Sequence, residues 1–390
     1  MGKSTLLKTL YPNVKYYTFD DKLLLQTVES DPKLFLKNAP SPVILDEVQY
    51  AANLFPYIKI ECDKDGNYEK YYLTGSQQLQ LIKKAKESLA GRISILELQG
   101  LSLREINGIS FNKHFVPTNE YIAEREKCLK PYDNLWKIIH KGAYPETYVV
   151  EREWIDFYSS YVNTYLERDI RGEIEIKDEL AFMRFLTACA ARTGQLLNYA
   201  NIAEEVGVSQ VTIKNWISVL SRTGLIYILQ PYYSSHLTRA IKTPKLYFRD
   251  TGLACYLSRW TSYEALENSA VANNMFETFV VSEIIKSFTN EGSEYDFSLF
   301  YYRGKDKVKG KVDGEVVEKE NKIDLIIEEN GTLYPIEIKK STNPTASMAN
   351  AFDVLDKVVD KNRGTGVILC RYDQKIYLCE DVVVLPIEYI

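Results

Sequence analysis

Four residues at the start of the chain, Gly2, Lys3, Ser4 and Thr5, have the types and spacing for nucleotide chemistry. The first three match the second half of the phosphate-binding loop G-x-x-x-x-G-K-[ST], and Thr5 follows directly. In such a loop the backbone N–H groups approach the phosphates, the lysine reaches the β and γ oxygens, and the hydroxyl holds Mg²⁺. We therefore expect this segment to bind ATP together with Mg²⁺.

The first glycine of that loop, and the strand that normally feeds it, would precede Met1. Either the start of the chain is assigned wrongly or the nucleotide site is incomplete. A parallel sheet that lacks a central strand leaves rows of backbone N–H and C=O groups unpaired, which is costly where they are buried. A misassigned start is therefore our expectation. If Met1 is the true start, the affinity for Mg-ATP should be poor.

Paired acids follow farther along, where the apolar run VILDE ends in Asp46 and Glu47. In a P-loop ATPase, Asp46 would hold Mg²⁺ and Glu47 would orient or deprotonate the attacking water. The next strand is followed by Ser76, which could sense the γ-phosphate, and Arg92 could neutralise phosphate charge in this chain or a neighbouring one. The alternatives are a strand end that turns into solvent and an ordinary surface arginine.

A second constellation surrounds Asn330-Gly331, the favoured residue pair for a two-residue hairpin turn. If these residues form the loop, Asp324 lies opposite Glu337, with side chains about 5 Å apart at Cβ, where like charges repel. Period-two alternation puts Lys339 on the same face as Glu337. A divalent hard cation, Mg²⁺ or Mn²⁺, is the simplest partner for two facing carboxylates. The lysine beside it would stabilise a developing phosphate charge or position water.

This Asp…Glu-x-Lys pattern resembles the PD-(D/E)xK nucleases of the restriction-endonuclease-like fold, which also carry a glutamate on a preceding helix. The stretch NMFETFVVSEIIKSF offers Glu277 and Glu283, and we expect Glu283 to be that glutamate. The resemblance implies metal ligands in Glu283, Asp324 and Glu337, and catalytic roles for Asp324, Glu337 and Lys339. The alternative to this fold is an ordinary strand pair with a solvated face. Cleavage is a further question, because nuclease-like domains can keep the shape after losing activity.

Residues 196–229 lie between the two constellations and read LLNYANIAEEVGVSQVTIKNWISVLSRTGLIYIL. A helix, a Gly-Val-Ser turn in which Ser209 can cap, a second helix near 210–222 and a β-type run have the layout of a winged helix-turn-helix. The second helix would enter the major groove of DNA. Its polar candidates for base contacts are Gln210, Thr212, Lys214, Asn215 and Arg222. A rigid linker or a protein contact is an equal alternative.

The elements that must position these residues change along the chain. Strands at Val14–Phe19 and within SPVILDEVQY, KYYLTGSQQ and GRISILEL alternate with helices, which predicts an α/β domain with a parallel sheet. Helices dominate the middle, and the last third is rich in strands. We predict a P-loop NTPase domain without its first strand at 1–132, a helical and winged-helix segment at 133–260, and a restriction-endonuclease-like α/β domain at 261–390.

The composition is that of a globular protein, with 45% hydrophobic and 26% charged residues. A net charge of -5 gives no global attraction to nucleic acid, so any DNA contact needs a local basic patch. The six cysteines form no C-x-x-C pair, which favours reduced thiols. With no apolar run of membrane-spanning length and no signal peptide, we expect a cytoplasmic protein without a membrane partner.

Seven stretches occur in an order that carries a wider resemblance: GKSTLLK, VILDEVQ, LTGSQQ, SLAGRI, LSLREI, GAYPE and YLERDI. Together they resemble the AAA-type ATPases of bacteria and archaea that carry a C-terminal domain of unknown function, number 4143. The resemblance covers nearly the whole chain and implies an ATPase core, a winged-helix segment and a nuclease-like C-terminal fold. The truncated phosphate loop and the stretch LQGLSL, where a proline is expected before Leu-Ser, depart from the pattern.

Two functions of different classes follow. The first is an ATPase coupled through the winged helix to a metal-dependent nuclease-like domain that cleaves or grips DNA. The second is a nucleotide-switched interaction protein whose C-terminal domain binds nucleic acid or protein without chemistry. A degenerate chain that binds no nucleotide is a third reading. Besides ATP, the candidate partners are DNA and, in a homo-oligomer, further copies of the chain.

Overall fold

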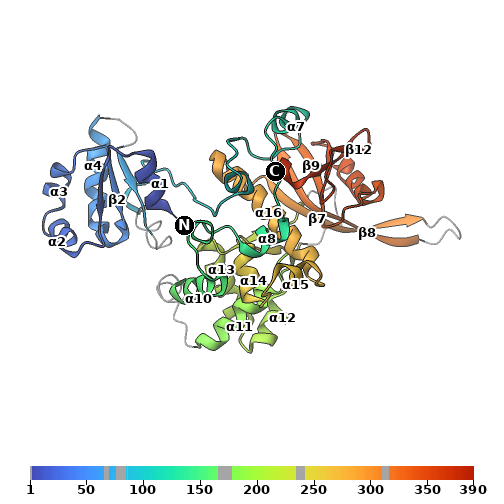
Figure 1. The fold of residues 1–390 in the computed structure, drawn as a ribbon, viewed down its shortest axis with the longest axis horizontal. Helices are drawn as coiled ribbons and strands as arrows, with labels where there is room; N and C mark the ends of the chain where they lie inside the picture. Colours follow the sequence, from blue (N-terminus) through green and yellow to red (C-terminus); the bar gives the residue numbers. More distant parts are fainter. Residues whose placement is uncertain are drawn as a thin grey trace. The chain divides into compact units, whose positions relative to one another are not determined.

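The computed structural model describes residues 2–65, 70–75, 85, 87–165, 178–233, 242–309 and 316–390 (Figure 1). The chain divides into two compact units, the first made by residues 1–98 and 159–176 and the second by 99–158 and 177–390. No helix in the described ranges is long and apolar enough to cross a membrane.

The first unit is built on a parallel sheet of the order β1-β2-β3, which is the α/β architecture that the sequence predicts. The strands are β1 (Lys15–Thr18), β2 (Val43–Asp46) and β3 (Tyr71–Leu73). The helices are α1 (Lys3–Leu10), α2 (Lys22–Ser30), α3 (Pro32–Asn38), η1 (Val48–Leu54) and α4 (Phe55–Asp65). All four residues of β2 are buried, as expected for a strand covered on both faces, and they deliver Asp46 to the carboxyl edge of the sheet.

The strand predicted in GRISILEL does not form. Residues 93–99 have no regular secondary structure. A β-strand needs a neighbour for its backbone N–H and C=O groups. Among the described strands, β3 pairs only with β2, so its other edge offers no ladder to this segment. The apolar side chain of Leu96 is consequently 82% exposed.

The second unit begins earlier than the predicted boundary at residue 132. Its first helices are α6 (Leu103–Ile106), α7 (Asn119–Glu126), α8 (Leu135–Lys141) and α9 (Glu146–Val149). The next helix, α10 (Trp154–Tyr165), is divided between the two units after Tyr158. Arg104 is buried and its Nε donates to the backbone oxygen of Ile390 at 2.9 Å. The backbone N–H of Phe115 donates to Ser287 Oγ at 2.9 Å. Residues after 98 therefore pack with the C-terminal half of the chain.

The middle segment, residues 178–248, contains the two helices predicted on either side of the Gly-Val-Ser turn and a small antiparallel sheet of the order β4-β6-β5. Its elements are α11 (Glu179–Ala190), β4 (Gln195–Leu196), α12 (Tyr199–Val206), α13 (Gln210–Arg222), β5 (Ile226–Leu229) and β6 (Lys245–Phe248). The predicted cap is confirmed, because the Ser209 hydroxyl accepts the N–H of Thr212 at 3.1 Å. Two short helices, α14 (Thr251–Leu257) and α15 (Tyr263–Glu267), lead onward.

The C-terminal part sets the long helix α16 (Ala272–Glu291) beside a mixed sheet of the order β12-β13-β11-β9-β8-β7, with β10 next to β9. The strands are β7 (Leu299–Lys309), β8 (Val316–Glu329), β9 (Thr332–Lys339), β10 (Asn362–Arg363), β11 (Gly366–Cys370), β12 (Ile376–Cys379) and β13 (Val382–Pro386), with 3₁₀ turns at Ala346–Ala349, Phe352–Lys357 and Ile387–Tyr389. Strands β7, β8 and β9 are antiparallel, whereas β9, β11 and β13 are parallel.

The predicted hairpin turn between β8 and β9 is confirmed. Asn330 and Gly331 both have left-handed backbones, with φ of 50° and 76°, as a two-residue turn of this kind requires. The register runs from Glu329 opposite Thr332 to Leu325 opposite Ile336, as the turn predicts.

Candidate functional site

The described residues of the predicted nucleotide site come together at the carboxyl edge of the parallel sheet. Helix α1 begins directly after Gly2, whose backbone is left-handed with φ of 76°. Ser4 Oγ donates to the two carboxylate oxygens of Asp46 at 2.9 and 3.0 Å. Lys3 Nζ donates to the backbone oxygen of Gly75 at 2.6 Å. A hydroxyl, a carboxylate and an ammonium thus share one corner of the first unit.

Asp46 is the most heavily hydrogen-bonded member of this corner. It is 6% exposed, and the hydroxyls of Thr74 and Tyr16 donate to it in addition to that of Ser4. Burial by itself would raise the pKa of Asp46, but the three hydroxyl donors outweigh it and lower that pKa below its usual range. Burial and the neighbouring carboxylate raise the pKa of Tyr16 to about 12. Asp46 is therefore ionised at neutral pH, and with Ser4 it presents the oxygen donors that suit Mg²⁺.

Glu47 follows Asp46 with an unusual backbone. Its φ of 53° and ψ of 40° lie in the left-handed region, which costs a residue with a Cβ atom on the order of 1 kcal/mol. The side-chain amide of Gln49 donates to its carboxylate. The remaining predicted residues contribute less: Thr5 is exposed on α1, and Ser76 lies outside the described residues.

Arg92 does not lie beside this corner. Its Nε is 2.5 Å from Asp63 Oδ1, near the C-terminal end of α4. That end adjoins the beginning of β3, since Lys70 Nζ donates to the backbone oxygen of Glu61 at 3.0 Å. All strands of a parallel sheet begin at the same end of the sheet and finish at the other. Arg92 therefore lies near the amino ends of the strands, whereas Asp46 lies at their carboxyl ends. Within the chain, the structure gives Arg92 a surface ion pair instead of the predicted phosphate contact.

The three hairpin residues predicted to act together do meet in the structure. Asp324 is fully buried, and Glu337 is 6% exposed. Lys339 Nζ lies 2.5 Å from Glu337 Oε1 and 3.3 Å from Asp324 Oδ2. The backbone N–H of Ile338 also donates to Asp324 Oδ2, at 3.1 Å.

Two further lysines, which we did not predict, contact the same carboxylate. Lys322 Nζ lies 2.6 Å from Asp324 Oδ1, and Lys245 Nζ lies 3.8 Å from that oxygen and 2.7 Å from Glu277 Oε1. Lys322 precedes Asp324 by two positions on the same strand, so strand periodicity could have indicated it. Lys245 comes from β6 of the middle segment, and no local pattern points to it. We call the six residues that meet here the carboxylate–lysine cluster. They are Lys245, Lys322, Lys339, Glu277, Asp324 and Glu337.

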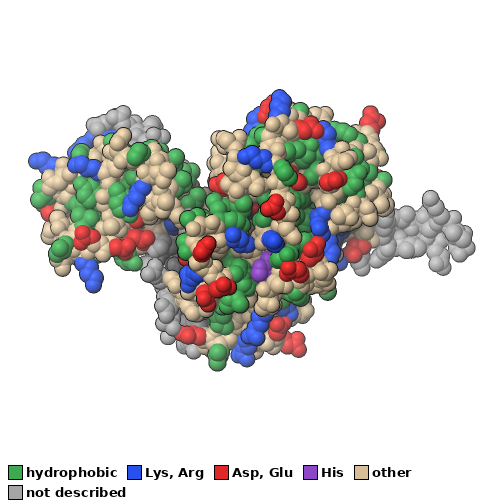
Figure 2. Space-filling model, in the orientation of Figure 1, with side chains coloured by type: hydrophobic (Ala, Val, Ile, Leu, Met, Phe, Trp, Pro, Cys, Tyr) green, Lys and Arg blue, Asp and Glu red, His purple; other side chains and the backbone are tan. Residues whose placement is uncertain are grey.

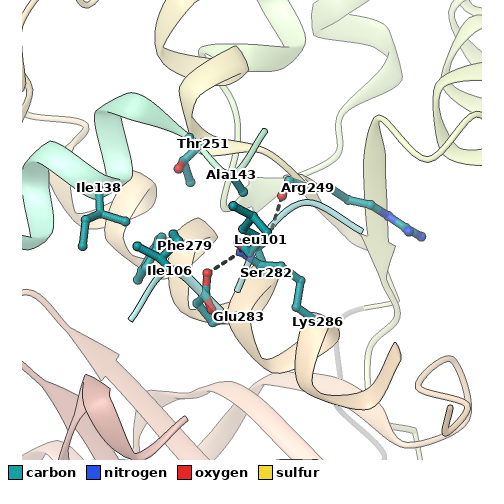
Figure 3. A pocket seen from close by; sticks show the side chains of 11 residues that line it. Leu101, Ile106, Ile138, Ala143, Arg249, Thr251, Phe279, Ser282, Glu283 and Lys286 are labelled. Atoms are coloured by element: carbon teal, nitrogen blue, oxygen red, sulfur yellow. Dashed lines mark hydrogen bonds and ion pairs between the residues drawn. The ribbon is translucent and has the colours of Figure 1, made fainter. Parts of the chain in front are cut away.

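The choice of Glu283 as the α16 glutamate of this site is not supported. Its carboxylate pairs with Lys286, and both residues line a small pocket (Figure 3). The same carboxylate accepts the backbone N–H of Leu103 at 2.8 Å. Glu277 is the glutamate of α16 that reaches the cluster. Six residues of α-helix rotate a side chain by about 240°, so the two glutamates point in different directions.

The electrostatics of the cluster differ between its two hairpin acids. Burial would raise the pKa of Asp324, but attraction to Lys245, Lys322 and Lys339 lowers it well below its usual range. Burial and repulsion from Asp324 raise the pKa of Glu337 to about 7. One acid is therefore ionised throughout the neutral range, while the other exchanges its proton near pH 7.

Glu337→Gln is expected to remove a pH dependence of stability. The folded state keeps the Glu337 proton up to a pH of about 7, whereas the unfolded chain releases it near 4.5. The free energy of unfolding of the wild type should therefore fall between these pH values, by up to about 3 kcal/mol, and remain lower above them. Urea unfolding of both proteins across this window measures the difference. Equal slopes for Glu337→Gln and wild type would contradict the assignment, and exposed Glu380→Gln should keep the wild-type slope.

A divalent cation does not fit the cluster as it stands. No group of three or more His, Cys, Asp or Glu side chains within the described ranges is placed to hold a metal ion. The neighbours of the Asp324 oxygens are ammonium groups, which occupy the positions that a cation would need. The Mg²⁺ or Mn²⁺ predicted between Asp324 and Glu337 is thus replaced, in this arrangement, by lysines.

The predicted DNA-reading helix carries little positive charge. Gln210, Lys214, Asn215 and Arg222 are exposed on α13, whereas the Thr212 hydroxyl pairs with that of Ser209. Helix α12 exposes Glu204 and Glu205. On the face drawn in Figure 2, acidic and basic side chains of the described residues are interspersed. Phosphate neutralisation, which dominates the affinity of nucleic-acid binding, therefore has few groups here to supply it.

Known families match three successive parts of the chain. Residues 1–107 match an AAA domain, residues 132–264 match a domain of unknown function, DUF8612, and residues 272–390 match a domain of unknown function, DUF4143. An AAA domain is a nucleotide-binding module, in agreement with the arrangement of Lys3, Ser4 and Asp46.

The chain is also similar to two mycobacterial proteins. The uncharacterized protein Rv2008c of Mycobacterium tuberculosis and the uncharacterized protein Mb2031c of Mycobacterium bovis are each 25% identical over 396 aligned positions, which span this whole chain and 78% of theirs. The crystal structure of protein VC1899 from Vibrio cholerae covers 89% of this chain and 70% of its own at 9% identity, with a TM-score of 0.18 that is too low to indicate a shared fold. The chain therefore contains an AAA domain at its N-terminal end and a DUF4143 domain at its C-terminal end.

Proposed function

We propose that this protein binds and hydrolyses Mg-ATP in its first unit. The observation that carries the proposal is the contact of Ser4 Oγ with both carboxylate oxygens of Asp46, at 2.9 and 3.0 Å. A P-loop hydroxyl and an acid at the end of a neighbouring strand are the two protein groups that hold Mg²⁺ in such ATPases. The AAA match over residues 1–107 supports the same assignment.

The proposed chemistry assigns one task to each residue. Ser4 and Asp46 would hold Mg²⁺, which supplies charge neutralisation at the phosphates when bound. Lys3 would exchange the backbone oxygen of Gly75 for phosphate oxygens, a stronger acceptor for an ammonium. Glu47 would accept the proton of the attacking water, and its strained backbone, held at the end of β2, supports such a role.

Lys3→Ala is expected to weaken Mg-ATP binding roughly 10- to 100-fold, because charged hydrogen bonds contribute about 1.5–3 kcal/mol each. Equilibrium titration with a fluorescent ATP analogue in the presence of Mg²⁺ measures this change. Lys8→Ala is the matched control, since Lys8 lies on the same helix but stacks over the Tyr16 ring at 3.7 Å. Equal affinities for wild type and Lys3→Ala, or no binding by the wild type, would contradict the proposal.

For the C-terminal domain, the carboxylate–lysine cluster favours the interaction protein over the nuclease. We propose that α16 and the sheet from β7 to β11 form the restriction-endonuclease-like fold, and that this domain, with the middle segment as a winged helix, binds its partner without cleaving it. The supporting observation is that lysine ammonium groups stand at the Asp324 oxygens where a catalytic cation would bind. ATP turnover in the first unit would then switch binding.

No cleavage of plasmid or branched DNA is expected from the full-length protein with Mn²⁺. The reason is that hydrolysis by two carboxylates and a lysine requires a cation that the three ammonium groups displace. The assay compares wild type with Asp324→Ala at matched concentration, after circular dichroism shows that both are folded. Nicking by the wild type that disappears in folded Asp324→Ala would establish the nuclease instead.

A further inference from the structure

Lys245 is the only lysine of the carboxylate–lysine cluster that is deeply buried. Its side chain is 3% exposed, against 41% for Lys322 and 35% for Lys339. Its Nζ lies 2.7 Å from Glu277 Oε1, 5.3 Å from the centre of the Tyr301 ring and 6.0 Å from that of Tyr247. The Tyr247 hydroxyl donates to the same Glu277 oxygen at 2.6 Å. The ammonium is thus enclosed by acids and ring faces.

The backbone around Lys245 is fixed by contacts between the middle segment and the C-terminal domain. The strand that carries it, β6, pairs with β5, and the chain after β5 pairs with β7: Tyr232 N–H donates to Tyr301 O at 2.6 Å, and Tyr301 N–H donates to Gln230 O at 3.1 Å. On the other side, the hydroxyls of Thr193 and Thr278 pair at 2.9 Å. Lys245 therefore cannot leave by a side-chain rotation into solvent, as Lys322 and Lys339 can.

The charges of the cluster balance without a metal ion. Three acids, Glu277, Asp324 and Glu337, face the ammonium groups of the three lysines, so the charges balance once Glu337 has lost its proton near pH 7, and below that pH the lysines are in excess. A divalent ion at Asp324 would place its charge within a few ångströms of buried Lys245, where repulsion is only weakly screened. Removing one partner from a buried ion pair also costs free energy, because the other charge is left buried without compensation. The ammonium of Lys245 and the carboxylates of Glu277 and Asp324 therefore stabilise one another in this position.

We propose that Lys245, supplied by the middle segment, is the resident cation of the C-terminal carboxylate site and keeps that site closed to Mg²⁺ and Mn²⁺. The site is then a set of buried ion pairs that connects the middle segment to the C-terminal domain. Divalent ions would gain access only where β6 separates from α16 and β8. This proposal does not depend on ATP hydrolysis in the first unit.

The test is Mn²⁺ binding to the full-length chain without nucleotide, measured by the electron paramagnetic resonance signal of free Mn²⁺. All proteins carry Asp46→Asn, which removes the acid of the N-terminal site. Adding Lys245→Met, which removes the charge and leaves an unbranched side chain one atom shorter, is expected to create one Mn²⁺ site. The background protein should show none at the same concentrations. Adding Asp324→Asn to Lys245→Met should abolish the new site.

Lys286→Met is the matched control, because Lys286 is equally buried at 4% exposure and pairs with an acid of the same helix, Glu283. It should create no Mn²⁺ site. Binding by the background protein that Asp324→Asn abolishes would overturn the proposal, as would folded Lys245→Met that binds no Mn²⁺. Should Lys245→Met fail to fold, Lys245→Gln, which retains a hydrogen-bond donor, takes its place. Mn²⁺ binding by folded Lys245→Gln would support the proposal, and no binding would overturn it. If that variant also fails to fold, the Mn²⁺ titration of the protein that carries only Asp46→Asn is the test: no binding supports the proposal, and binding that Asp324→Asn abolishes overturns it.

Discussion

Replacing Glu47 by glutamine is expected to slow ATP hydrolysis by about 10²- to 10⁴-fold, the usual contribution of a general base. Glutamine keeps the size and hydrogen-bonding reach of the side chain but cannot accept a proton from water. Mg-ATP binding should change little, because Lys3, Ser4 and Asp46 are the groups that we propose to hold the nucleotide. The variant is therefore expected to remain in the ATP-bound state.

Single-turnover hydrolysis at saturating protein measures the chemical step, and fluorescence titration measures binding. Glu29→Gln, a change at an exposed position of α2, is the control and should hydrolyse ATP at the wild-type rate. Hydrolysis by Glu47→Gln within a few-fold of the wild type would remove Glu47 from the chemistry. Its left-handed backbone would then be only a feature of the turn after β2.

Asp324→Asn is expected to lower the free energy of unfolding of the second unit by about 3–5 kcal/mol. The substitution removes the fully buried carboxylate that Lys245, Lys322 and Lys339 share. Lys322 and Lys339 can turn toward water, but Lys245 would remain buried with Glu277 as its acid. Adding Lys245→Met to Asp324→Asn should therefore cost less than the sum of the two single changes.

Tryptophan fluorescence during urea unfolding measures this effect in the second unit alone, because all four tryptophans lie there. Asp353→Asn is the control: this acid is 82% exposed and lies 3.9 Å from Arg363, so the change should stay within about 0.5 kcal/mol. A similarly small effect for Asp324→Asn would show that the buried ion pairs contribute little. Additive costs in the double variant would deny the coupling between Asp324 and Lys245.

Several elements could be predicted from the sequence because their signals are local. Asn330-Gly331 favours a two-residue turn by its backbone preferences, and that turn alone sets the register that brings Asp324 and Glu337 together. Ser209 marks the start of α13 through the hydroxyl that caps it. The apolar run before Asp46 indicated a buried strand ending in an acid.

Other features depended on contacts between distant segments. The segment GRISILEL has the composition of a strand, but a strand exists only where a neighbour pairs with it. Arg92 is near Asp63 because of the direction in which α4 crosses the sheet. The choice between Glu277 and Glu283 depended on which side of α16 packs against β6 and β9, and both sides of that helix are buried.

The sequence by itself therefore determined the local units of this protein: the helix after Gly2, the strand that ends in Asp46, the helix that Ser209 caps and the hairpin with its facing acids. Their causes are turn geometry, capping and hydrophobic periodicity, which act over a few residues. Only the tertiary structure decided that Lys245 joins those acids. An ion pair in a protein interior is selected by burial and by the fit of whole elements, and neither is encoded in the residues next to Lys245.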